Sequence, residues 1–105
     1  MRIAIPVEEN RGVDSLICEH FGRAPYFAVV DVGEGGVSVE VRKNPLIEHT
    51  AGALPELLKS WGVDRIVASR MGQKAQLFFN QFGIDVVLGV SGTVRDAIRA
   101  LELDE

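Results

Sequence analysis

The sequence contains a single cysteine, Cys18, among its 105 residues. One thiol cannot form an internal disulfide bond, and by itself it cannot supply a four-cysteine iron–sulfur cluster or a structural zinc site. Any metal that this chain binds must therefore find other ligands.

Long apolar runs and an excess of positive charge are also missing. No run approaches the roughly 20 apolar residues that span a bilayer, and the chain begins with a strand-like run in place of a signal sequence. Fifteen acidic residues against 11 basic ones give a net charge of −4, which disfavours binding to nucleic-acid phosphates and anionic lipids. We therefore expect a cytoplasmic protein that binds neither nucleic acid nor membranes.

The length and composition predict one globular domain over residues 1–105. A chain of this length buries roughly two-thirds of its unfolded surface around one core. The composition is 47% hydrophobic and 25% charged, without any low-complexity tract, as is typical of an ordered domain.

The amino-terminal half predicts three strands. Residues 3–7 form a β-branched apolar run, with Pro6 expected near the strand end because proline lacks an amide donor. After a long connection, the apolar run 26–32, a glycine-rich turn and the alternating residues 37–41 predict a β-hairpin. The alternation is typical of an edge strand. We expect a monomer or a weak homodimer formed through this edge.

The carboxyl-terminal half predicts helices that alternate with buried strands. Apolar residues three and four positions apart indicate helices over residues 53–61 and 75–82, and a third helix that begins at Thr93. A glycine and a short apolar strand follow each of the first two helices. Such tandem units imply parallel strands joined by right-handed crossovers. The predicted fold is therefore α/β: a mixed five-stranded sheet in the order 3-2-1-4-5, with strand 2 antiparallel, and three helices.

Residues 18–23 gather the densest site chemistry of the chain. Imidazole nitrogen and thiolate sulfur both bind iron well, and the spacing of Cys18 and His20 in a loop can present both to one site. The alternative is that Cys18 is a small buried apolar residue and His20 fixes the loop through a hydrogen bond. His49, ahead of the first helix, is a further candidate ligand or else a solvated loop residue.

Several loops are predicted to meet at one end of the sheet. Ligands of open sheets bind beyond the carboxyl ends of parallel strands, and the connections 8–25, 69–73 and 89–93 leave from those ends. These loops and the helix starts beside them carry positive charge and free helix amides, both of which attract anions, or else they form a solvated surface. The residues concerned are Arg23, Arg70, Gly72, Lys74, Gly92 and Thr93, and Met71 offers a soft contact or simply packing.

Five segments resemble one known family in their order along the chain. They are residues 3–7, residues 19–27 with His20-Phe21-Gly22, His49 ahead of a small-residue helix start, residues 69–72 and residues 92–94. The sequence is similar, from residue 2 to about residue 101, to the dinitrogenase iron–molybdenum cofactor biosynthesis family, the NifX/NafY-like domain with ribonuclease H-like topology. Ser69-Arg70 stands where the family has a Gly-Gly pair.

The resemblance implies a non-enzymatic carrier of an iron–sulfur or iron–molybdenum precursor cluster that exchanges it with donor and acceptor proteins. It implies a ligand role for the histidine of His-Phe-Gly, which is His20. An alternative is a regulatory or scaffold domain that binds a protein partner and a small anion or nucleotide. A ribonuclease H-like hydrolase is disfavoured, because its two metal ions need a carboxylate on the first strand and residues 3–7 contain none.

Overall fold

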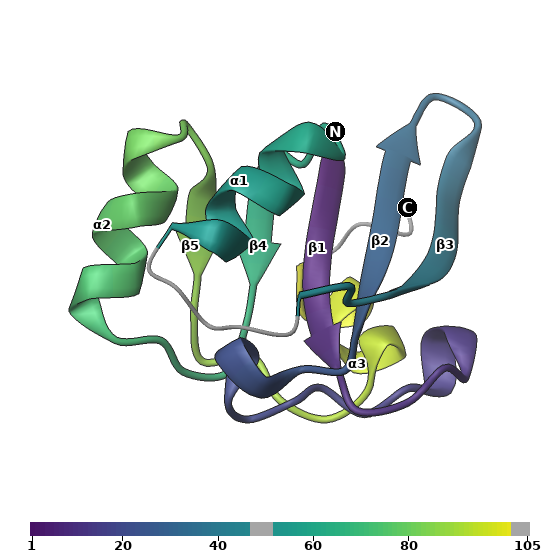
Figure 1. Ribbon diagram of the computed structural model, residues 1–105. Helices are drawn as coiled ribbons and strands as arrows, with labels where there is room; N and C mark the ends of the chain where they lie inside the picture. The colour runs from purple at the N-terminus through teal and green to yellow at the C-terminus, as the bar shows by residue number, and fades with distance from the viewer. Residues whose placement is uncertain (47–51, 102–105) are drawn as a thin grey trace.

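The computed structural model describes residues 1–46 and 52–101 of the chain. Its elements, in chain order, are β1 (Arg2–Val7), η1 (Gly12–Asp14), η2 (Phe21–Arg23), β2 (Tyr26–Gly33), β3 (Gly36–Lys43), α1 (Ala53–Ser60), β4 (Arg65–Val67), α2 (Gln73–Gln81), β5 (Asp85–Val87) and α3 (Val94–Ala100), where η marks a single-turn 3₁₀ helix. The sheet order is β3-β2-β1-β4-β5, with β2 antiparallel to both neighbours and β1, β4 and β5 parallel (Figure 1). The predicted fold class and strand order are confirmed.

The sheet lies between two helical layers. Helices α1 and α2 cover one face, and α3 covers the other (Figure 1). Central strand β1 contributes side chains to both faces, and its residues from Ile3 to Val7 are fully buried. This explains why that stretch reads as a continuous apolar run, since a strand covered on both faces has no polar side.

Pro6 lies inside β1 at a position where no amide is needed. It is opposite Phe27 of β2, whereas on the other side of β1 the pairing with β4 stops at Ala4. Beyond that point the carbonyl of Pro6 accepts a hydrogen bond from the Cys18 amide at 2.8 Å. The backbone of Pro6 therefore faces the side that β4 has left, and residues 16–18 take the place of β4 along the end of β1.

Glycines end the first two helices and turn the chain into the parallel strands. Gly62 and Gly83 both have positive φ, 78° and 73°, which favours glycine. Strands β4 and β5 are three residues each, because their ladder covers only residues 65–67 and 85–87. Helix α3 begins with a capping box, in which the Thr93 hydroxyl accepts a hydrogen bond from the Asp96 amide and the Asp96 carboxylate accepts one from the Thr93 amide.

The aromatic face of α2 is only partly buried. Phe79 is fully buried, while Phe78 and Phe82 are half-buried because α2 lies over the β5 edge of the sheet (Figure 1). The longest described helix, α2, has nine residues, and none in the described ranges is long and apolar enough to cross a membrane.

Candidate functional site

The connections that follow β1 and β4 come together at the carboxyl edge of the sheet. Residues 19–23 follow β1 and residues 70–72 follow β4, and a parallel backbone bridge joins His20 to Arg70. From β1 the chain builds outward to β2 and β3 on one side and to β4 and β5 on the other. Open α/β sheets bind ligands at such a switch point, so the fold itself marks this edge.

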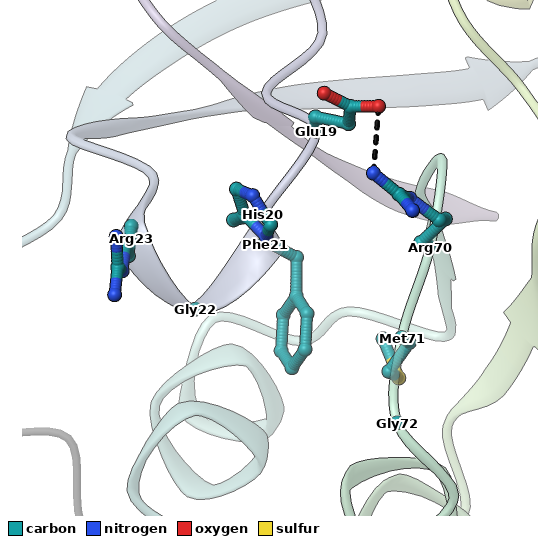
Figure 2. A pocket seen from close by; sticks show the side chains of 8 residues that line it. All are labelled: Glu19, His20, Phe21, Gly22, Arg23, Arg70, Met71 and Gly72. Atoms are coloured by element: carbon teal, nitrogen blue, oxygen red, sulfur yellow. Dashed lines mark hydrogen bonds and ion pairs between the residues drawn. The ribbon is translucent and has the colours of Figure 1, made fainter.

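A hollow of about 500 Å³ opens between these two connections (Figure 2). Its size is within the range of small-ligand sites. The residues that line it are Glu19, His20, Phe21, Gly22, Arg23, Arg70, Met71 and Gly72. The fold thus brings together five of the predicted site residues: His20, Arg23, Arg70, Met71 and Gly72. Cys18 and Lys74 do not line the hollow, and His49 is outside the described residues.

His20 has a fixed backbone and an exposed side chain. Its carbonyl accepts hydrogen bonds from the Arg23 amide at 2.9 Å and from the Cys18 thiol at 3.2 Å. His20 is exposed, and Figure 2 shows its imidazole between Arg23 and the Glu19–Arg70 pair. Because its backbone is already fixed, this imidazole can bind a metal without a change in the loop.

The Cys18 thiol is placed beneath the loop and away from the hollow. The residue is only 8% exposed, and its Sγ donates to the carbonyl of His20. Burial raises the pKa of this thiol, against a smaller opposing contribution from the His20 backbone, and the Glu8 and Glu19 carboxylates raise it further. At neutral pH the sulfur is therefore a protonated packing and hydrogen-bonding group in this structure.

This geometry predicts slow alkylation of Cys18. In the native protein near pH 7.5 we expect iodoacetamide to react at least about tenfold more slowly than in urea, because the thiolate is the nucleophile and the native thiol is both buried and protonated. Mass spectrometry gives the rates, and Ser38→Cys in a Cys18→Ala background is the exposed control. Equal native and unfolded rates for Cys18 would contradict the assignment.

An ion pair connects the two walls of the hollow. Arg70 Nη2 lies 2.8 Å from Glu19 Oε1 (Figure 2), and both side chains are about two-thirds exposed. Such a pair contributes little to stability, about 0–1 kcal/mol. Its carboxylate is easily exchanged for another anion. Arg70 is therefore available to a negatively charged ligand.

The amino terminus of α2 adds to the positive character of this edge. Gly72 is the N-cap residue, and no side chain caps the helix. The first amides of a helix carry a partial positive charge that favours anions. By contrast, the amide of Thr93 at the start of α3 already donates to the Asp96 carboxylate at 2.9 Å, and Thr93 does not line the hollow.

Two lining residues, Glu19 and Phe21, are not among the predicted site residues. Glu19 could have been found only by pairing opposite charges across the two loops. Phe21 packs edge-on against Phe79 of the core, with ring centroids 6.0 Å apart, and so anchors the η2 turn. The core thus directly supports the loop that carries His20.

The described part of the chain offers few metal ligands at any one place. Within residues 1–46 and 52–101 no three or more His, Cys, Asp or Glu side chains gather in a way that could hold a metal ion. A metal at the hollow would rest on His20, with Glu19 as the other lining donor of this kind.

Comparison with known proteins places this geometry in a family. A family model described as dinitrogenase iron–molybdenum cofactor matches residues 1–103. The crystal structure of PH0822 is 40% identical, with a TM-score of 0.86 over 96% of this chain and 89% of that chain. An NMR structure from Thermotoga, described as a NifB protein of the DUF35 family, is 32% identical, with a TM-score of 0.78 over 96% and 86% of the two chains.

A third structure is the apo form of the orange protein from Desulfovibrio gigas. It is 28% identical, with a TM-score of 0.81 over 96% of this chain and 86% of that chain. The family match covers the five strands and three α-helices of the described residues and both walls of the hollow. The match relates the chain to the biosynthesis of the iron–molybdenum cofactor. The chain belongs to the dinitrogenase iron–molybdenum cofactor family.

Proposed function

We propose that this protein binds and carries an anionic iron–sulfur or iron–molybdenum precursor cluster, with His20 as its principal protein ligand. The observation that carries the proposal is the exposed imidazole of His20 on a hollow that also holds Arg23, Arg70 and the uncapped start of α2. Family membership supports the same cargo.

The chemistry of these groups suits a carrier. Imidazole nitrogen binds iron, and sulfide-bridged clusters are anionic, so the two guanidinium groups and the amides of the α2 start offset their charge. A single imidazole leaves most metal positions of a preformed cluster to its own sulfides. Cargo held by so few protein bonds passes readily to a partner that offers more ligands.

The other predicted residues have subordinate roles in this proposal. Met71 and Gly72 form the wall beside α2, and Lys74 adds charge in the first turn of that helix. Cys18 supports the His20 loop and becomes a ligand only if the loop rearranges. His49 is proposed as a second imidazole ligand. The protein acts in the cytoplasm without catalysis, between cluster donor and acceptor proteins.

The test is anaerobic loading of the metal-free protein. Incubation with an iron–sulfur cluster or an isolated iron–molybdenum cluster should give charge-transfer absorption that co-elutes with the protein on gel filtration. We expect His20→Ala to retain less than about a tenth of that absorption, since outer-shell losses alone cost 10- to 100-fold in metal affinity. Gln81→Ala, an exposed change at the far end of α2, is the control and should load like wild type.

Equal loading of wild type and His20→Ala would remove His20 from the site. If neither protein loads and a nucleotide raises the melting temperature of both, the alternative of a regulatory or scaffold domain replaces the carrier. That alternative is favoured by one observation, the uncapped α2 terminus beside Arg70. Phosphodiesterase activity with magnesium or manganese would overturn the non-enzymatic role.

A further inference from the structure

The outer edge of β3 is a long strand edge that no other described strand covers. β3 spans Gly36–Lys43 and pairs with β2 through eight consecutive residues without a bulge. It contains no proline, and the opposite edge, β5, is only three residues long. Proteins normally shorten, bulge, interrupt or charge such an edge, because its free amides and carbonyls can pair with another strand. Of these devices β3 shows only charged side chains, and its Glu40 and Arg42 are of opposite sign.

The direction of the free backbone groups follows from the pairing with β2. The Asn44 amide donates to the Pro25 carbonyl at 2.9 Å, so the backbone of Asn44 faces β2. In an antiparallel pair the residues that face the partner strand alternate. Since Asn44 faces β2, the residues at odd-numbered positions of β3 face away from it. The backbone amides and carbonyls of Val37, Val39, Val41 and Lys43 therefore point to the open side of the sheet.

We infer that β3 pairs with β3 of a second copy of this chain, antiparallel and two-fold symmetric, with Val41 opposite Val41 of the partner. In such a pair the outward-facing backbone groups of the two copies must lie opposite each other. The two-fold axis can therefore pass through Val39, Glu40, Val41 or Arg42. A centre at Glu40 or Arg42 places like charges directly opposite each other, which is destabilising. A centre at Val39 places Glu40 opposite a serine. Only the Val41 centre places Glu40 of each copy opposite Arg42 of the other.

The side chains on both faces of β3 fit this register. Glu40 and Arg42 lie on the α1 face, where their own ion pair spans 2.6 Å and Arg42 rests on the Trp61 ring. In the symmetric pair they meet across a position without mutual backbone bonds, where opposing side chains approach most closely. On the α3 face, the half-buried Val41 packs against its symmetry mate. The result is a continuous ten-stranded sheet.

The decisive experiment is a charge-swap series studied by sedimentation equilibrium at low salt. The wild type should shift from 11.4 kDa toward twice that mass as its concentration rises toward the millimolar range. Glu40→Arg and Arg42→Glu should each weaken association at least about tenfold, because two like-charge pairs then face each other. The double variant Glu40→Arg/Arg42→Glu should restore it to within about threefold. Arg95→Glu, on α3, is the charge control.

Amide exchange of the unmodified protein provides a second test that needs no variant. The outward amides of Val39, Val41 and Lys43 should become protected as concentration rises. A chain that stays monomeric at millimolar concentration would overturn the inference, as would single variants that associate like wild type. If these amides are protected only by an added strand peptide of another sequence, the edge belongs to a heterologous partner and the inference is wrong.

Discussion

Replacement of Phe79 by alanine is expected to lower the free energy of unfolding by about 3–5 kcal/mol. Phe79 is fully buried between α1, α2 and the sheet, in a cluster with Leu58, Ile66 and Ile84. Removing its ring leaves a cavity among side chains that are fixed by three elements, so the gap cannot close. Urea unfolding followed by circular dichroism measures the change.

Phe78 provides a matched control for this prediction. It is the neighbouring phenylalanine on α2 and is only half-buried, so Phe78→Ala removes the same atoms but should lower the free energy of unfolding by less. A comparable decrease in the two variants would contradict the conclusion that Phe79 is the one fully buried aromatic on α2.

Phe79→Ala should also affect the proposed binding site. Phe21 loses its edge-on partner in Phe79→Ala and with it the anchor of the η2 turn. At a temperature where the variant is folded, cluster loading should fall in Phe79→Ala and remain near normal in Phe78→Ala. A loading defect of equal size in both would show that the Phe21 contact is not responsible.

Replacement of Gly92 by alanine is the second large expected effect, a loss of about 2 kcal/mol or more. Gly92 has φ of +95°, and an L-residue in this region costs roughly 1–2 kcal/mol. An added Cβ would also collide with the Asp96 carboxylate that caps α3. Thermal unfolding measures the loss of stability.

Gly89 separates the two causes of this effect. It has φ of +84°, and nothing lies within 4 Å of the Cβ that alanine would add. Gly89→Ala therefore carries the backbone strain without the collision, and it should be clearly less destabilising than Gly92→Ala. Equal losses would mean that the contact with Asp96 is unimportant.

The capping box also gives this comparison a pH dependence. Hydrogen bonds from Thr93 lower the pKa of the Asp96 carboxyl below its ordinary value. Because the pKa of Asp96 is lower in the native state, the ionised Asp96 carboxylate stabilises the fold at pH values above its unfolded pKa. This stabilisation is lost as pH falls through the native pKa. The difference between wild type and Gly92→Ala should therefore shrink in acid.

The strand order could be predicted from the sequence because local signals and chain connectivity agree. The hairpin of β2 and β3 and the repeated helix–glycine–strand units leave few ways to build one sheet. The placement of His20 and Arg70 on one edge followed from the rule that parallel strands end at the same side. The short length of β4 could not be predicted, since it depends on which ladder partners are present.

The position of the Cys18 side chain could not be predicted either. Spacing alone allows both Cys18 and His20 to point to one site, whereas the pairing of residues 16–18 with the end of β1 turns the thiol inward. That pairing exists because β4 ends early beside Pro6, a tertiary effect without a local signal. The Glu19–Arg70 pair has the same origin, because it joins residues 51 positions apart.

The fixed backbone of His20 has a thermodynamic consequence for the proposed uptake and release of a cluster. Three contacts, from the Cys18 thiol, the Arg23 amide and the bridge to Arg70, already order the loop before any cargo arrives. In the proposed carrier, binding would then restrict the His20 imidazole and the Arg23 and Arg70 side chains, at an entropic cost of about 0.5–1.5 kcal/mol for each side chain. The loaded and empty protein would therefore share one fold, and an acceptor would compete only with the bonds to the cargo and not with a folding transition.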